Sequence, residues 1–451
     1  MTVPPRDRIS TLGLVAATFF IVSGGPYGLE EIVLGHGYRG AIVLLLVVPL
    51  LWSLPVALMV GELGASLPAT GGYYVWVRRA MGPFWGLQEA WLSLAVGIVN
   101  VAIYPVLLVT YLQHFWPGLG PGAGWRVSLA AIALGTAVNA LGIRSVGRSS
   151  TALTITLLAP FVVMLVAAAA SVPGGGLLAA ERAFRQPAPS DAAKIAAGFM
   201  MAMWNLMGFD NASTFAAEVN DPGRSYPRAM LIATALITIV YVAPVLAASA
   251  TGLPAAAWSA GSWVEVGARL GGRSLAAAVM AGGVISAVGL FVAQLLSWSR
   301  LPVALAEDGW IPRWIALRSA RTHAPVRAVV LGGILSAACV GMGLRQLVQI
   351  NVLLYGAGLV LELVALIVLR VREPALPRPF RIGGGLATVT LLAVIPTALL
   401  GVAAWVVRNE PGPLGMSAIG FSAAVALVGP AWWAVTRLAR RRAVEVQRQS
   451  E

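Results

Sequence analysis

Seven carboxylate side chains lie within, or at the ends of, long apolar stretches of this 451-residue sequence. They are Glu30, Glu31, Glu62, Glu89, Asp210, Glu218 and Glu362. An ionised carboxylate at the centre of an apolar membrane helix costs at least ~2.5 kcal/mol, so such residues are functional candidates by default. The alternative for each is a helix-end position that reaches water or a fixed hydrogen bond. Lysine and arginine are nearly absent from the same stretches, so a cavity lined by these carboxylates would favour an organic cation, a proton, or both.

The elements that must hold these carboxylates are membrane-spanning helices. Apolar residues make up 58% of the chain, and only 11% of its residues are charged. Because a membrane span needs ~20 mostly apolar residues, the roughly 260 apolar residues would supply about twelve spans. The mean hydropathy of +0.82 agrees with this count. The composition therefore excludes a soluble globular enzyme and predicts an all-α integral membrane protein.

Apolar windows bounded by Arg, Pro or Gly clusters predict twelve spans. They fall near residues 10–35, 40–66, 84–115, 125–142, 150–172, 193–218, 227–251, 274–299, 326–343, 346–369, 386–407 and 415–436. Segment 254–272 is too polar to span, and we expect it at the outer membrane surface. The first apolar stretch lacks a small-residue cleavage site after a short apolar core, so it is interpreted as a retained helix and not as a signal peptide.

The basic residues predict the orientation of these spans. The chain has 31 Lys and Arg against 18 Asp and Glu, a net charge of +13. With the N-terminus inside, 22 of the 31 basic residues fall on the cytoplasmic side and the remaining 9 outside. This asymmetry predicts a multi-pass protein of the plasma membrane with both termini in the cytoplasm. Basic loops facing anionic lipid also explain the charge surplus without nucleic acid as a partner.

Two of the predicted spans interrupt their own helical pattern. In the first, the apolar run ends at Ser23-Gly24-Gly25-Pro26-Tyr27-Gly28, and in the sixth it meets the segment Trp204–Asn211. Glycine and proline disfavour a continuous helix, and unwound backbone at membrane depth persists only where it lines a cavity or is buried in protein. An ordinary kink is the alternative for either break alone.

The positions of the two breaks indicate a transporter. They lie in the first and sixth spans, so the repeating unit has five spans, and a unit with an odd number of spans must be inverted in its second copy. Interrupted helices at matching positions of inverted repeats indicate a transporter's central site. We therefore predict a single membrane domain over residues 1–451. It would contain a first five-helix repeat (10–172), a second inverted repeat (193–370) and two appended helices (386–437).

Motifs of catalysis and metal binding are missing from the sequence. It has no HExxH, Walker A or G-x-S-x-G pattern. The single cysteine, Cys339, permits neither a disulfide framework nor a cysteine-based metal site. We expect no enzyme activity, cofactor, metal or obligatory protein partner. Without an ATP-binding module, transport would have to draw on an ion or solute gradient.

Several segments resemble the plant and protozoan polyamine-uptake transporters, which belong to the L-type amino acid transporter branch of the amino acid–polyamine–organocation (APC) superfamily. The resemblance is carried by Val22–Glu30, Trp52–Pro55, Gly61–Leu63, Thr70–Trp76, Gly82–Glu89, Tyr104–Leu107, Asn205–Leu206, Asp210, Ala212–Thr214, Glu218–Val219 and Asp221–Pro227. It covers helices 1–7 with specific motifs and helices 8–12 mainly in pattern. It implies a five-plus-five inverted-repeat, leucine-transporter-like core and, often, proton-coupled uptake of amines or amino acids.

Two departures from that family concern the substrate. Asn100 stands where the polyamine carriers have an acidic residue, and Phe209 stands where they have a tryptophan. The loss of an acid removes one contact to an amine, so a polyamine, a cationic amino acid and a neutral amino acid all remain open as substrates. The predicted function is proton-coupled symport of a polyamine or amino acid; the alternatives are a proton-independent amino acid exchanger and a neutral amino acid permease.

The predicted substrate site combines both breaks with polar residues of helix 3. Its residues are Ser23, Gly24, Gly25, Pro26, Tyr27, Gly28, Glu30, Asn100, Tyr104, Trp204, Asn205, Gly208, Phe209 and Asp210. Glu30 and Asp210 are expected to bind a substrate amine, and Trp204 and Phe209 are candidate gating aromatics that could offer a cation–π face. Asp210 and Glu62 are the candidate proton carriers. For Glu62 the alternative is a fixed hydrogen bond at the end of helix 2.

Overall fold

The computed structural model describes residues 9–69, 71–116, 118–141, 146–187, 189–214, 216–319 and 324–449. Its α-helices are α1 (Thr11–Val22), α2 (Glu30–Val48), α3 (Leu54–Ser66), α4 (Gly72–Met81), α5 (Pro83–Phe115), α6 (Pro121–Ala140), α7 (Val146–Ser171), α8 (Gly176–Phe184), α9 (Ala192–Asn205), α10 (Pro222–Ser249), α11 (Ser262–Trp298), α12 (Arg300–Glu307), α13 (Val326–Cys339), α14 (Leu344–Arg372), α15 (Gly385–Val406) and α16 (Ala418–Gln449). Short 3₁₀ turns include η4 (Phe209–Thr214) and η5 (Ala216–Glu218). Among the described residues, β-pairing is limited to two isolated bridges. The predicted all-helical class is confirmed.

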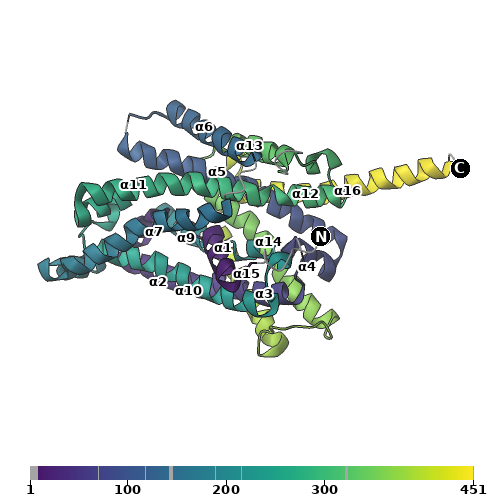
Figure 1. Cartoon of the computed structure of the whole chain (residues 1–451), viewed down its shortest axis with the longest axis horizontal. Helices are drawn as coiled ribbons and strands as arrows, with labels where there is room; N and C mark the ends of the chain where they lie inside the picture. Colours follow the sequence, from purple (N-terminus) through teal and green to yellow (C-terminus); the bar gives the residue numbers. More distant parts are fainter. Residues whose placement is uncertain are drawn as a thin grey trace.

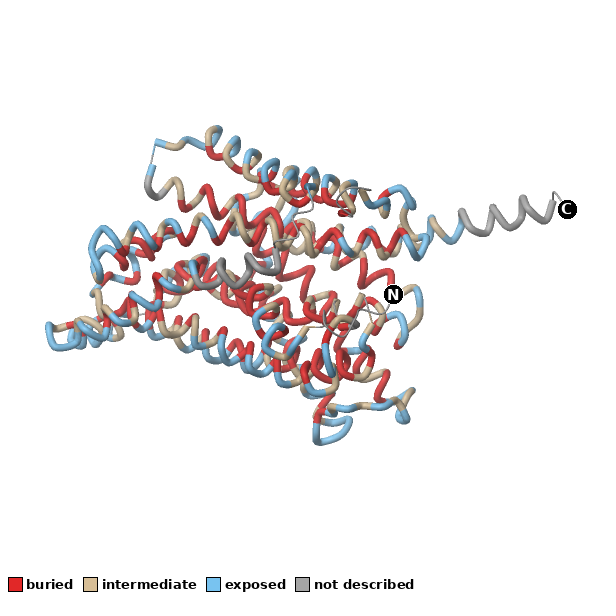
Figure 2. The backbone as a smooth tube through the Cα atoms, viewed as in Figure 1, coloured by how far each residue is buried: buried red, intermediate tan, exposed pale blue. Residues whose placement is uncertain are grey.

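The protein crosses the membrane several times. Within the described residues, eight helical stretches are long and apolar enough to span a bilayer, and α1 and α13 are shorter apolar helices. Large apolar side chains such as Leu46, Val163, Ile239 and Leu391 are exposed on outward faces. Figure 2 shows exposed and intermediate residues along the outer helices, with buried residues gathered between them. Outward apolar faces next to a buried, partly polar interior are what a lipid environment requires.

The helices pack as two groups around the broken segments (Figure 1). In one group, α2 packs on α9 and α3 packs on α10, while α1 contacts both α10 and η4. In the other, α5 packs against α11, α6 and α13. The long helix α14 contacts α5 as well as α9, so it lies where the two groups meet. Residues from the first and second halves of the sequence therefore face one another across the interior.

Local sequence explains where several helices start and stop. The Ser10 side chain caps α1 by accepting a hydrogen bond from the Gly13 N–H at 3.1 Å. Asp191 caps α9 in the same way, accepting from the N–H groups of Ala193 and Lys194. Each cap satisfies backbone donors that the first helical turn leaves free. After α1 and α9, however, no new α-helix begins at once, and both predicted breaks are present.

The segment 254–272 is more deeply packed than its expected surface position. The side chains of Trp258 and Trp263 are 2% and 0% exposed, and their rings meet edge to face at 5.0 Å. The Trp258 indole N–H donates to the Tyr38 hydroxyl at 3.0 Å. From Ser262 the chain is already helical and joins the predicted span through a kink at Gly271 and Gly272. The aromatic residues of this segment are therefore packed inside the protein and not exposed at its surface.

Candidate functional site

The first break runs from Ser23 to Leu29, between α1 and α2. Gly25 has a φ of 81°, a left-handed conformation that costs side-chain-bearing residues energy. A Cβ atom at Gly25 would also overlap the side chain of Leu157 in α7. The Ser23 hydroxyl accepts a hydrogen bond from the Gly25 N–H at 3.2 Å. Backbone conformation and close packing therefore both favour glycine here.

The second break follows Asn205, the last residue of α9. Gly208 has a φ of 101°, and its N–H donates to the Tyr355 hydroxyl at 3.0 Å. That hydroxyl in turn donates to the carboxylate of Asp210. The Asn205 carbonyl, left free by the helix end, accepts from the Tyr241 hydroxyl at 3.1 Å. Tyr355 of α14 thus connects the unwound backbone to the carboxylate at its centre.

A small cavity of about 50 Å³ lies between the two breaks. Seven of the predicted substrate residues line it: Gly24, Tyr27, Asn100, Tyr104, Trp204, Asn205 and Gly208. The Trp204 indole N–H donates to the Asn100 side-chain oxygen at 3.1 Å, so these two lining residues are linked to each other. No charged side chain is among its lining residues.

A larger cavity of about 490 Å³ adjoins the small one and shares Asn100, Gln294 and Tyr355 with it. It extends to Arg300, Arg318 and neighbouring loop residues, at the end of the molecule that the charge pattern predicts to be cytoplasmic. We call this the inner end and the opposite one the outer end. The acidic residues in the lining are Glu89, Asp210, Glu218, Glu307 and Glu362, and the basic ones are Arg300 and Arg318. Five acidic against two basic side chains make this cavity attractive to cations.

Asp210 is the predicted site residue that joins the breaks to the acidic cavity. Its side chain lines the larger cavity, although the residue is only 4% exposed. Ser23, Gly25, Pro26, Gly28 and Phe209, which were also predicted, are not among the lining residues of either cavity. Phe209 is 1% exposed and packs in the core, which leaves Trp204 as the gating candidate that faces the site.

Glu30 is placed differently from its predicted role as an amine ligand. One carboxylate oxygen accepts from the Gly28 N–H at 2.8 Å. The other accepts from the Tyr111 hydroxyl at 2.6 Å and from the Gly261 N–H at 3.2 Å. Glu30 lines neither cavity. Because three donors already surround it, this carboxylate ties the first break to α5 and to the outer segment that precedes α11.

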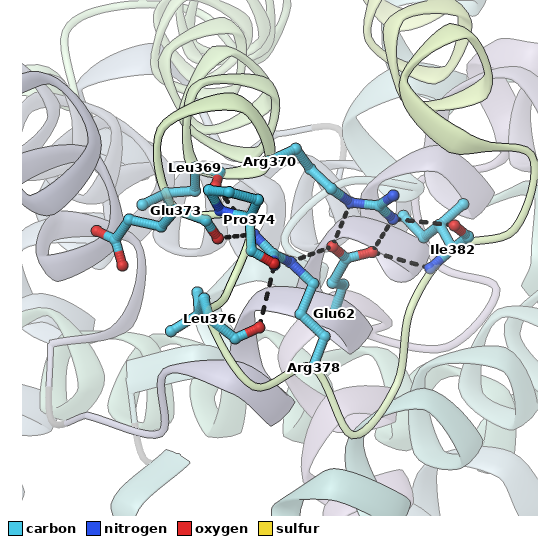
Figure 3. Close-up of polar contacts among 8 residues, drawn as sticks. All are labelled: Glu62, Leu369, Arg370, Glu373, Pro374, Leu376, Arg378 and Ile382. Carbon is cyan, nitrogen blue, oxygen red and sulfur yellow. Dashed lines mark hydrogen bonds and ion pairs between the residues drawn. The ribbon is translucent and has the colours of Figure 1, made fainter.

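Glu62 lies in a buried ion cluster (Figure 3). Its carboxylate accepts from Arg370 at 2.6 and 2.5 Å and from the Ile382 N–H at 2.9 Å, and Arg378 lies 3.3 Å away. Arg378 also donates to backbone carbonyls, including those of Leu369 and Glu373. Of the two roles considered for Glu62, the fixed hydrogen bond at the end of helix 2 is the arrangement seen here.

Sequence reasoning missed Tyr355, Gln294 and Ser286 as site residues. Gln294 donates to the Ile21 carbonyl at 3.2 Å and to the Tyr104 hydroxyl at 3.3 Å, and Ser286 donates to the Gly24 carbonyl at 2.9 Å. A usable signal existed for Tyr355, which lies two helical turns before Glu362 and so shares its face of α14. Gln294 stands in an ordinary apolar stretch and gave no comparable signal.

A polytopic helical membrane protein whose broken helices border an acidic internal cavity has the architecture of a transporter. The comparisons with known proteins agree. The amino acid permease family model matches residues 12–430. The chain is 35% identical to polyamine transporter PUT1 of Oryza sativa subsp. japonica, over 87% of this chain and 73% of the relative. It is 32% identical to polyamine transporter RMV1 of Arabidopsis thaliana, over 89% and 81% of the two chains. An uncharacterized transporter of Mycobacterium tuberculosis is 28% identical, over 86% and 81%.

The chain therefore belongs to the amino acid permease family and is a membrane transporter, not an enzyme. The resemblance to polyamine-uptake transporters, first indicated by motifs around the two breaks, is confirmed.

Proposed function

We propose that this protein is a secondary active transporter that takes up an organic amine, either a polyamine or an amino acid, by proton-coupled symport across the plasma membrane. One observation carries the proposal: the acidic cavity leads from Asp210, at the second break, to the inner end of the molecule. A cation entering this cavity meets more acidic than basic groups. The polyamine transporters named above support amines as the substrate class.

The proposed topology has twelve spans in one domain, with both termini in the cytoplasm. Two inverted repeats, residues 10–172 and 193–370, would form the core, and residues 386–437 would be appended. The two breaks support this arrangement because they lie in the first and sixth proposed spans. Matching breaks in inverted repeats place a substrate between them near mid-membrane.

The proposed transport cycle alternates access between the two ends. Toward the outer end, Trp258 and Trp263 are buried, and the Gly261 N–H donates to Glu30. Toward the inner end, the larger cavity reaches exposed residues such as Arg300. A closed outer layer and an inner cavity correspond to an inward-facing state.

In the proposed recognition mode, the carboxylate of Asp210 accepts a charge-assisted hydrogen bond from the substrate ammonium group. Tyr355 orients this carboxylate, and the indole of Trp204 offers a face for a cation. Asp210 is also the proposed proton carrier, because it is buried at the point where the two cavities meet. Glu62 is less suited to that role, since it is paired with Arg370 and Arg378.

We further propose that transport needs no sodium. In transporters with broken helices, carbonyl groups freed by unwinding coordinate the coupling ion. Here the carbonyl of Gly24 already accepts from Ser286, and the nearby carbonyl of Ile21 accepts from Gln294. Donor side chains that occupy these carbonyls weaken the case for a metal cation at the first break.

A second candidate is a neutral amino acid permease or exchanger. The observation that favours it is the small cavity itself, whose lining has polar groups but no charged side chain. In that case Asp210 would serve coupling alone. The two candidates differ in whether a cationic or a neutral substrate competes at the central site.

Counterflow in proteoliposomes tests the proposal. Proteoliposomes that contain the purified protein are loaded with one unlabelled solute, and uptake of the same solute in labelled form is measured. Polyamines, arginine, lysine and neutral amino acids are added outside as competitors of this uptake. Competition by amines, together with uptake that rises with an inward proton gradient, is the expected result. Competition by neutral amino acids alone would favour the second candidate, and dependence on external sodium at fixed pH would overturn proton coupling.

A further inference from the structure

Two carboxylates that line the larger cavity each have an oxygen without a hydrogen-bond partner. Glu89 of α5 and Glu362 of α14 are 1% and 2% exposed, yet both line the cavity. Glu89 accepts one hydrogen bond from Ser93 at 2.8 Å through Oε1, whereas the Oε2 atoms of Glu89 and Glu362 are buried without a partner. A buried polar atom left unpaired costs about 1–3 kcal/mol, and more when it is charged. These two oxygens therefore mark a place where a donor is missing.

The packing of α5 against α14 keeps the two carboxylates together. Gly358 lies beside Glu89, and a Cβ atom at Gly358 would be 3.3 Å from Glu89 Oε2. The absent side chain leaves room at the carboxylate on the cavity wall. Glu89 and Glu362 also lie within electrostatic range of each other and of Asp210. Like charges at this range destabilise one another unless a cation or protons intervene.

The missing partner is better supplied by an ammonium group than by a metal ion. In the part of the chain that the structure describes, no group of three His, Cys, Asp or Glu residues is placed to hold a metal. An ammonium group carries three donors and no acceptor, which suits carboxylate oxygens on different helices. The two carboxylates are also separate from the central site, because Glu362 lies seven residues beyond Tyr355, about 10 Å farther along α14.

We infer that Glu89 and Glu362 form a second ammonium-binding subsite, inward of Asp210, that holds the distal amine of a linear diamine or polyamine. The inference rests on the proposed function and makes its substrate class more specific. One amine pairs with Asp210, the methylene chain runs along the cavity, and the next amine lies between the carboxylates of Glu89 and Glu362. The subsite supplies acidic groups for a polyamine although Asn100, at the central site, is neutral.

The test compares amines that differ only in their second charge. Butylamine, putrescine and spermidine are titrated by calorimetry into the purified full-length protein and its Glu89→Gln, Glu362→Gln and double variants. A lost hydrogen bond to a charged group lowers affinity by about 10- to 100-fold. We expect the double variant to lose at least about ten-fold in affinity for putrescine and spermidine. Affinity for butylamine, which has no second amine, should stay within about two-fold.

Glu181→Gln is the control. It removes one negative charge from the protein, but Glu181 is exposed and lines neither cavity. We expect it to bind all three amines like the wild type. Unchanged diamine affinity in the double variant would overturn the subsite and leave these carboxylates as proton carriers. If the wild type binds none of these amines but binds an amino acid, the subsite is overturned and the proposed function stands; if it binds neither class, the proposed function fails.

A measurement on the wild type covers the case in which the variants do not fold. Affinity is measured for α,ω-diamines of increasing methylene number. Two separate ammonium subsites predict that affinity rises until the chain spans both, whereas monoamines of the same lengths show no such optimum. Parallel length dependence in the two series would contradict the subsite.

Discussion

The buried acids of this transporter fall into two groups with opposite surroundings. Glu62 is 0% exposed, and Arg370, Arg378 and a backbone N–H surround its carboxylate. Glu89 and Glu362 are equally buried, but each has an oxygen without any partner and faces a cavity. Both groups belong to the residue type whose burial in a membrane indicates function. The difference lies in what the protein provides to balance the charge.

This contrast separates acids that the protein itself neutralises from acids left open beside a cavity. A carboxylate whose donors all come from the protein has no capacity left for a ligand, and it fixes the helices that carry its partners. A carboxylate left incomplete next to a cavity can obtain its donor from substrate or from protons. Glu30, with three donors, behaves like Glu62, whereas Asp210, with one tyrosine donor and a cavity beside it, is intermediate.

The largest expected effect is on the stability of the fold, at the buried ion cluster of Glu62, Arg370 and Arg378. Glu62→Ala leaves Arg370 and Arg378 buried without their anion, and breaking a buried ion pair on one side costs about 3–5 kcal/mol. We expect a marked fall in the thermal unfolding temperature in detergent, with substrate affinity retained by the folded fraction. Glu181→Ala, which breaks an exposed pair with Arg185, is the control and should cost under about 1 kcal/mol. A stable Glu62→Ala protein that had lost only proton-driven uptake would mean that Glu62 is a proton carrier and not a structural residue.

The next effect is on affinity, at Asp210. Asp210→Asn keeps the size of the side chain and removes its charge. Loss of one partner from a buried charge pair costs about 2–5 kcal/mol, roughly 30- to several-thousand-fold in affinity. We expect cationic substrates to lose binding on this scale in equilibrium measurements, while a neutral amino acid suffers less. Preserved binding together with lost proton-driven uptake would make Asp210 a proton carrier only.

The two breaks offer a test at the level of the backbone. Gly25→Leu and Gly208→Leu each place a side chain at a left-handed position, which costs about 1–3 kcal/mol. At Gly25 the new side chain also meets Leu157. We expect both variants to be expressed but to lose uptake in proteoliposomes. Gly401→Leu in α15, where a Cβ would meet nothing within 4 Å, is the control. Wild-type uptake by the Gly25 and Gly208 variants would move the site away from the breaks.

The smallest effect concerns an ion pair at the surface. Arg79 donates two hydrogen bonds to Glu373, at 3.0 and 2.7 Å, and thereby holds the pKa of Glu373 below its ordinary value. A lowered carboxylate pKa stabilises the fold at pH values above the unfolded-state pKa of about 4.3. This stabilisation is lost as the pH falls through the pKa that Glu373 has in the folded state. We expect Arg79→Ala to cost under about 1 kcal/mol at neutral pH and nothing at strongly acid pH. A cost that persists at acid pH would require another cause.

Much of the fold follows from local sequence. Long apolar runs and their Gly and Pro interruptions determine helix positions within a few residues, because helical hydrogen bonds form between neighbours in the chain. The predicted span 346–369 corresponds to α14 (Leu344–Arg372), and the breaks after Val22 and Asn205 lie where the glycines predicted them. The same reasoning recognised each buried acid as a candidate.

Only the tertiary structure decided what surrounds each acid. Glu62 meets Arg370 across 308 positions of sequence, and Asp210 meets Tyr355 across 145. The sequence placed Glu30 and Asp210 in the same role, but helix packing gave Glu30 three donors and left Asp210 beside a cavity. Local sequence determines which residues enter the membrane interior, since that depends on hydropathy. Whether a buried charge is neutralised by the protein or left for a ligand depends on contacts between distant helices, and chain-local rules do not encode those contacts.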